Sequence, residues 1–154
     1  MVGVADRSGV VHAPGGVDVE SLLSNRSPLG DIDRERLPDG HRQLPAEAWL
    51  ELGADVIVPA AVSDVIDASN CGRVEASLVV EGANIPITEE ARRLLQGRGV
   101  PVVPDFVANA GTMDCFNWTA MGELEADAGQ VFARVRDLMD RNVPASSTWP
   151  TSWA

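Results

Sequence analysis

Two short segments each carry one asparagine in a small-residue stretch that follows an apolar run. Val79 to Glu90 reads VVEGANIPITEE, and Pro104 to Gly111 reads PDFVANAG. In open α/β sheets, ligands bind outside the carboxyl ends of parallel strands, and glycine and alanine there let the backbone approach a ligand closely. Asn84 and Asn109 would offer such a ligand amide donors and acceptors. Each segment alone also suits an ordinary turn, but together they indicate one elongated polar ligand.

The elements that must position these asparagines are predicted from the alternation of apolar runs with helical patterns. Strands are expected at residues 2–5, 55–58, 77–80 and 100–103, with a further short one at 10–12. Helices are expected at 18–23, 45–52, 63–70, 88–97 and about 117–141, with Asp18 and Thr88 as N-caps. Strands that alternate with helices predict a sheet of four main parallel strands with right-handed crossovers.

Composition narrows the class of protein. The chain has 154 residues, a length that favours one domain. Its net charge of -11 disfavours nucleic acid and anionic membranes as partners. The same charge also serves solubility. Cys71 and Cys115 lack metal-ligand spacing, as do His12 and His41, so we expect free thiols and no metal. No apolar run approaches the ~20 residues that span a bilayer, and the expected location is cytoplasmic.

Five segments carry a family resemblance. They are, in order, VGVADRSGVVHAPGGVD (2–18), GADVIVPAA (53–61), ASLVVEGANIPITEEA (76–91), GVPVVPDFVANAG (99–111) and Trp118. They resemble the C-terminal, NAD(P)-binding domain of the glutamate/leucine/phenylalanine/valine dehydrogenases. The resemblance runs from Met1 to about Trp118, and the VEGAN and ANAG segments at this spacing are specific to that family.

The resemblance implies a fold and also a truncation. The expected fold is α/β: a truncated Rossmann-like (doubly wound) parallel sheet lacking its first strand, with a long C-terminal helix. The family's first strand and Gly-rich turn would precede Met1, and no G-x-G-x-x-G occurs in this sequence. The family's catalytic lysine lies in a substrate domain, whereas all 12 basic residues here are arginine. We therefore expect a partial dinucleotide-binding domain at 1–143, an irregular tail at 144–154, no catalytic residue, and no activity of this chain alone.

One cofactor-binding position is expected at the end of the first strand. An acidic residue there accepts hydrogen bonds from the adenosine ribose in Rossmann folds, and the resemblance gives Asp6 this role. The alternative is a turn aspartate that binds its own backbone. Arg7, the next residue, could instead meet a 2′-phosphate. NAD and NADP therefore both remain open, with NAD favoured.

The other cofactor-binding positions follow the later strands. The resemblance implies that Ala60 and Ala61 line the dinucleotide, that Gly82 and Asn84 contact the nicotinamide ribose, and that Asn109 approaches the carboxamide. None of these residues is an acid or a base. They would position a hydride acceptor rather than drive the deamination.

The leading functional hypothesis is the cofactor-binding part of an NAD(P)-dependent amino-acid dehydrogenase, glutamate-dehydrogenase-like, which deaminates an L-amino acid oxidatively to a 2-oxo acid and ammonia. The complete enzyme is expected to be a homo-oligomer. After Gly111 the sequence departs from the family's pattern and reads TMDCFNW. Asp114 in this segment would repel a substrate side-chain carboxylate, which argues against glutamate as the substrate; the same residue would also suit a helix cap. The alternative hypothesis is a non-catalytic binding or regulatory fragment that associates with a full-length paralogue.

Overall fold

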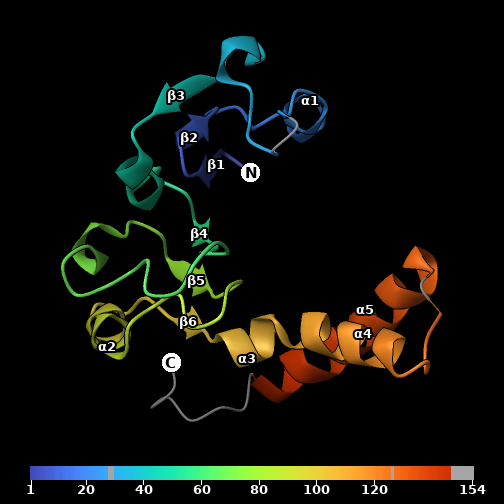
Figure 1. The fold of residues 1–154 in the computed structure, drawn as a ribbon. Helices are drawn as coiled ribbons and strands as arrows, with labels where there is room; N and C mark the ends of the chain where they lie inside the picture. The colour runs from blue at the N-terminus through green and yellow to red at the C-terminus, as the bar shows by residue number, and fades with distance from the viewer. Residues whose placement is uncertain (28–29, 126, 147–154) are drawn as a thin grey trace. The chain divides into compact units, whose positions relative to one another are not determined.

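The computed structural model describes residues 1–27, 30–125 and 127–146 of the chain (Figure 1). Packing divides the chain into two compact units. Unit 1 comprises Met1–Asp55 and Arg73–Ala76, and unit 2 comprises Val56–Gly72 and Ser77–Ala154. None of the helices in the described part of the chain has the length and apolarity that crossing a bilayer requires.

Unit 1 is built on an antiparallel sheet with the strand order β1-β2-β3. Its strands are β1 (Gly3–Asp6), β2 (Gly9–His12) and β3 (Arg42–Leu44). The β1–β2 hairpin closes with Asp6 opposite Gly9. A Cβ on Gly9, whose φ is +128°, would lie 2.7 Å from the Leu44 carbonyl oxygen, so only glycine fits here.

The pairing of β1 differs from the expectation of four parallel strands. The strand itself is confirmed, but within unit 1 it pairs antiparallel with β2. The physical reason is the connection: only Arg7 and Ser8 separate the two strands, and a two-residue turn joins antiparallel strands only. Val10 and Val11 of β2 are fully buried and form the centre of this unit.

Short helices complete unit 1. They are α1 (Val19–Ser24) and the 3-10 helices η1 (Arg34–Arg36) and η2 (Ala46–Glu51). Asp18 caps α1 as expected, since its side chain accepts a hydrogen bond from the Ser21 amide over 3.0 Å. The expected helix after Pro45 is present as η2.

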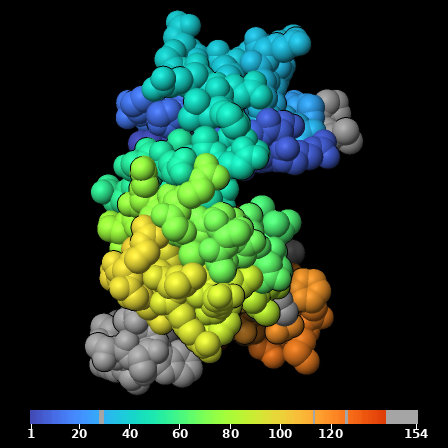
Figure 2. Space-filling view, turned by 90° about the vertical axis from the view of Figure 1, so that its left-hand side faces the viewer, coloured from blue at the N-terminus to red at the C-terminus, as the bar shows by residue number. Residues whose placement is uncertain are grey.

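Unit 2 contains a parallel sheet with the strand order β4-β5-β6. Its strands are β4 (Val56–Ile57), β5 (Leu78–Val80) and β6 (Val102–Val103). Parallel pairing is confirmed for these three strands. The helix α2 (Glu89–Gly97) is capped by Thr88, whose hydroxyl accepts a hydrogen bond from the Ala91 amide over 3.3 Å. Figure 2 shows residues of unit 2, coloured green to yellow, forming one continuous surface.

The prediction of a helix at 63–70 is wrong. That segment forms turns, followed by the short 3-10 helix η3 (Cys71–Arg73). Asp67 accepts hydrogen bonds from the Ser69 and Asn70 amides, and such local side-chain bonds compete with helix formation. Ile66 is fully buried and bridges Ile87 in parallel, so the segment behaves as an irregular extension of the sheet.

The sequence predicted one helix at about 117–141, where the structure has parts of two helices, and a turn at 105–111, where a further short helix lies. The three helices are α3 (Asp105–Ala108), α4 (Ala110–Ala120) and α5 (Ala128–Ser146). Gly122, with φ +73°, lies just after α4, so the chain turns there instead of continuing one helix. α4 and α5 pack so closely that a Cβ on Gly111 would lie 2.7 Å from Val135 Cγ1. Of the expected irregular tail at 144–154, residues 147–154 lie outside the described residues.

Candidate functional site

Small-residue turns come together at the carboxyl ends of the strands of unit 2. Pro59, Ala60 and Ala61 follow β4, and Gly82 follows β5 closely. The amides of Gly82 and Ala83 donate to the Pro59 carbonyl oxygen over 3.1 and 3.0 Å. A Cβ on Gly82 would lie 3.0 Å from Ala60 Cβ, so glycine permits this close approach. The expected positions 60 and 82 are therefore neighbours.

The two predicted asparagines form an amide pair. Asn109 Nδ2 donates to Asn84 Oδ1 over 3.0 Å, and Ser63 Oγ donates to the backbone carbonyl of Asn84 over 2.8 Å. Asn84 is exposed and Asn109 is half-buried. Among the described residues, neither Asn84 Nδ2 nor Asn109 Oδ1 has a hydrogen-bond partner. The pair therefore presents one amide donor and one amide acceptor at the surface.

A buried acid supports the loops that carry this pair. Glu81 directly follows β5 and is fully buried. Arg92 of α2 donates to Glu81 Oε1 over 2.6 Å, and the amide of Asp105, the first residue of α3, donates to Oε2 over 2.9 Å. Each carboxylate oxygen thus has a donor, as a buried charge requires. These bonds join the end of β5 to α2 and to the start of α3.

The loop after β5 also contains a strained residue. Ile85 has φ +47°, which is unfavourable for a β-branched side chain. Its amide donates to Asp105 Oδ2 over 2.8 Å, and its carbonyl oxygen accepts from the Asp64 amide over 3.0 Å. Strained backbone persists where surrounding contacts hold it, and it clusters at ligand sites. The conformation of the Asn84 loop is therefore fixed from both sides.

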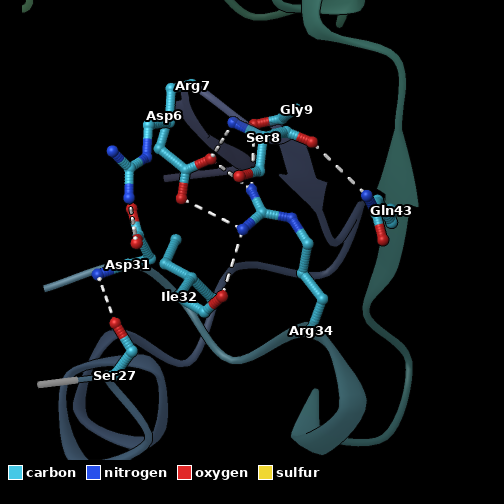
Figure 3. A network of polar contacts seen from close by, with 9 residues as sticks. All are labelled: Asp6, Arg7, Ser8, Gly9, Ser27, Asp31, Ile32, Arg34 and Gln43. Atoms are coloured by element: carbon cyan, nitrogen blue, oxygen red, sulfur yellow. Dashed lines mark hydrogen bonds and ion pairs between the residues drawn. The ribbon is translucent and has the colours of Figure 1, made fainter. Parts of the chain in front are cut away.

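In unit 1, the Asp6 carboxylate is held by Arg34 and Ser8 (Figure 3). Arg34 Nη1 donates to Oδ2 over 3.1 Å, and Nη2 donates to Oδ1. The Ser8 amide donates to Oδ1 over 2.8 Å, so the turn hydrogen bond that formed the alternative for Asp6 is present. Burial raises the pKa of Asp6, but the bonds from Arg34 and Ser8 outweigh burial and hold that pKa below its ordinary value.

Arg34 is itself tightly fixed. Nη1 also donates to the Ile32 carbonyl over 3.1 Å, and Nη2 to the Gly9 carbonyl over 3.2 Å. The side chain is only 13% exposed, and its Nε is buried without a hydrogen-bond partner. Both Nη nitrogens therefore donate twice, and the guanidinium has no Nη donor left for a further acceptor.

Arg7 differs from Arg34 in its exposure. Its side chain is 70% exposed and forms an ion pair with Asp31. The hydrogen bond to Asp31 raises the pKa of Arg7. Arg7 thus lies at the surface beside Asp6, where a guanidinium is accessible to an anion.

The structure brings Ala60, Gly82, Asn84 and Asn109 together in unit 2, with Ala61 exposed beside them, and it places Asp6 and Arg7 at the hairpin turn of unit 1. Sequence reasoning missed Arg34 and Glu81. Nothing signals Arg34, which is 28 residues from Asp6 in a polar stretch. Glu81 has a signal: it is a single acid at the end of a buried parallel strand.

The remaining expectations concern the cysteines, metal ligands and Asp114. Cys71 is buried, Cys115 is half-buried, and both are free thiols. In the described ranges, no three His, Cys, Asp or Glu side chains are grouped as metal ligands. Asp114 does not cap a helix, because it lies inside α4, four residues after that helix begins.

Small-residue turns at the ends of parallel strands and an acid at an earlier strand end are typical of α/β nucleotide-binding proteins. The family model described as Glutamate/Leucine/Phenylalanine/Valine dehydrogenase matches residues 1–148. The chain belongs to this family.

Curated relatives and a solved structure agree with this assignment. Over 120 residues the chain is 42% identical to glutamate dehydrogenase B of Halobacterium salinarum and 38% identical to an NAD-specific glutamate dehydrogenase of Staphylococcus aureus. Both matches cover 77% of this chain but only 27% and 28% of those proteins. The hetero-hexameric glutamate dehydrogenase of Thermus thermophilus matches with a TM-score of 0.73 and 29% identity, covering 94% of this chain and 34% of that one.

Proposed function

We propose that this chain is the nicotinamide-dinucleotide-binding part of an amino-acid dehydrogenase. The proposed reaction is the oxidative deamination of an L-amino acid to a 2-oxo acid and ammonia. Family membership and the glutamate dehydrogenase relatives support the reaction class, and the name of the Staphylococcus aureus relative supports NAD as the cofactor. The observation that carries the proposal is the Asn84–Asn109 amide pair at the carboxyl ends of parallel strands.

The residues of unit 2 fit the nicotinamide end of the cofactor. Asn84 Nδ2 and Asn109 Oδ1 offer a donor and an acceptor, and a carboxamide carries the complementary acceptor and donor. Ala60 and Ala61 are small and exposed, so a ribose can lie against the backbone there. When bound, the cofactor would supply the hydride acceptor; the residues named here would orient it.

The residues of unit 1 fit the adenosine end. Asp6 Oδ2 accepts one hydrogen bond from the described residues, from Arg34, so it retains acceptor capacity for a ribose hydroxyl. Arg7 is exposed beside it and is the proposed contact for a 2′-phosphate, so the proposal covers NAD and NADP. We also propose a homo-oligomer for the complete enzyme; the Thermus thermophilus relative is a hetero-hexamer, which supports oligomerisation but not identical subunits.

The proposal assigns no acid or base role to these residues. Amides and small side chains bind and orient a cofactor, but they do not exchange protons with a substrate amine near neutral pH. The proposal names no particular amino acid, because Asp114 in α4 carries a charge of the same sign as a substrate side-chain carboxylate.

The test is a titration of the isotope-labelled 154-residue chain with nicotinamide mononucleotide, followed by NMR. We expect the side-chain amide signals of Asn84 and Asn109 to shift, and Asn109→Ala to abolish the shift of Asn84. Asn117→Ala, in the exposed face of α4, is the matched control and should leave the titration unchanged. A titration that moves neither amide would refute the proposed cofactor site and favour a non-catalytic module.

The expected affinity is low. Each net hydrogen bond contributes about 0.5–1.5 kcal/mol, while association itself costs roughly 4 kcal/mol or more. Pyrophosphate affinity normally depends on the Gly-rich turn at a helix N-terminus, and this sequence has no G-x-G-x-x-G. For complete NAD we therefore expect a dissociation constant in the millimolar range, about −4 kcal/mol.

A further inference from the structure

The ion pair between Asp6 and Arg34 changes what the Asp6 carboxylate can bind. An ionised carboxylate has about four acceptor positions, two on each oxygen. Oδ1 accepts from Ser8 and from Arg34, which fills it, and Oδ2 accepts one bond from Arg34 (Figure 3). A single acceptor position remains, so Asp6 cannot accept both ribose hydroxyls while Arg34 is in place.

The pair also changes the charge that a ligand meets. An isolated carboxylate at this strand end would repel a 2′-phosphate and favour a 2′-hydroxyl. Arg34 places a full positive charge in direct contact with that carboxylate, and its side chain is mostly buried, 13% exposed against 23% for Asp6. Screening by water is therefore weak, and the two charges largely cancel for any ligand outside.

Arg34 is well held in this position without any ligand. Its two further hydrogen bonds go to the backbone carbonyls of Ile32 and Gly9, which belong to unit 1 on either side of the pair. Because each Nη nitrogen already donates twice, Arg34 itself does not contact a phosphate. Arg7 is the exposed cation beside Asp6 and is available for that contact.

We propose that Arg34 is a positioning residue that sets cofactor preference. By neutralising Asp6, it lets the adenosine site accept a 2′-phosphate as readily as a 2′-hydroxyl. This inference rests on the proposed function, since it concerns the adenosine end of the same cofactor. The sequence favoured NAD from Asp6 and Arg7 alone; the ion pair with Arg34 adds a second cation at Asp6 that the sequence did not indicate.

The test compares two nucleotides that differ at the 2′ position. Adenosine 5′-monophosphate and adenosine 2′,5′-bisphosphate are titrated separately into the labelled 154-residue chain, with the Ser8 and Gly9 amides as NMR reporters. For the unmodified chain we expect comparable dissociation constants. Arg34→Met should weaken the bisphosphate relative to the monophosphate by about tenfold, the effect of one unit charge several ångströms away at an intermediate dielectric.

Further variants separate the charge effect from loss of structure. Arg34→Lys retains the charge and should keep most of the original ratio. Asp6→Asn leaves Arg34 uncompensated and should favour the bisphosphate, and Asp6→Asn combined with Arg34→Met should restore a ratio near that of the unmodified chain. Arg36→Met is the matched control, because Arg36 lies in the same 3-10 helix but is 76% exposed and pairs with Asp33.

The outcomes separate this inference from the proposed function. If both nucleotides shift the reporters but their ratio is the same in Arg34→Met and Arg36→Met, the role of Arg34 is refuted while the cofactor site stands. If Arg34→Met does not fold, Asp6→Asn supplies the test. A ratio of the two dissociation constants that is the same in Asp6→Asn as in the unmodified chain also refutes the role of Arg34. If neither nucleotide shifts any reporter, the adenosine part of the proposed function fails and this inference fails with it.

Discussion

Replacing Glu81 with alanine should destabilise unit 2 more than any comparable surface change. The change leaves two groups without a partner: the guanidinium of Arg92 and the amide of Asp105. Breaking a buried ion pair by removing one partner costs about 3–5 kcal/mol. Arg92 is 20% exposed and can turn partly into water, so we expect the lower end, about 3 kcal/mol. At roughly 2–4 °C per kcal/mol for a chain of this size, the midpoint of thermal unfolding should fall by about 6–12 °C.

The assay is thermal and urea unfolding followed by circular dichroism at pH 7, with amide hydrogen exchange to locate the loss. Glu89→Ala is the matched control, because Glu89 pairs with Arg93 on the exposed face of the same helix and such pairs contribute about 0.5 kcal/mol or less. The double variant Glu81→Leu with Arg92→Met should be less destabilised than Glu81→Ala, since it leaves no charge unpaired. If Glu81→Ala unfolds within 1 °C of Glu89→Ala, or if exchange rises only in unit 1, the reasoning is refuted.

Three other predictions follow from the structure. Gly111→Ala should cost about 1–3 kcal/mol through overpacking, because the added Cβ would lie 2.7 Å from Val135 Cγ1; urea unfolding checks this, and Val135→Ala should recover part of the loss. Folding lowers the pKa of Asp6, so the unfolded chain binds more protons than the folded chain in acid. The contribution of Asp6 to the free energy of unfolding is therefore present above the ordinary Asp pKa of about 3.9 and is lost as pH falls below it. An acid titration of Asp6→Asn should therefore be flatter below about pH 4. The isolated chain, which has no lysine, should form no NADH from any amino acid; turnover abolished by Asn109→Ala would contradict this.

Sequence reasoning reached the parts of the fold that depend on local signals. Apolar runs located β4, β5 and β6, and short polar side chains located the caps at Asp18 and Thr88, because capping needs only a side-chain oxygen within reach of the next amides. Of the two segments expected as turns, the one holding Asn84 is irregular, whereas residues 105–108 of the other form the helix α3, and Asn109 lies between α3 and α4. The direct contact between the two side chains over 3.0 Å joins residues 25 positions apart and was not predicted; the sequence indicated only that both asparagines would serve one ligand.

What the sequence did not predict depends on contacts between distant residues. The spacing of apolar residues predicted one continuous helix over 117–141, although the chain turns at Gly122, just after α4. The segment 63–70 has helical spacing, but the local hydrogen bonds of Asp67 prevent a helix there. Arg34 illustrates the limit best: its partner Asp6 is 28 residues away, and no pattern in the intervening polar stretch indicates that the two meet.

Asp6 and Glu81 show how similar residues at strand ends acquire different roles. Both are acids that close a β-strand, and both are bound by an arginine from a later segment. Glu81 is fully buried, with a donor on each oxygen from two other elements, so it has no surface to offer a ligand and serves the scaffold. Asp6 is 23% exposed and keeps one acceptor position, so it can still bind. Arginine suits both places because its planar fork supplies several directed donors from one side chain, whereas lysine is a compact point charge. The degree of burial of the carboxylate, rather than its position in the strand, therefore decides which acid supports the structure and which remains open to the proposed cofactor contact.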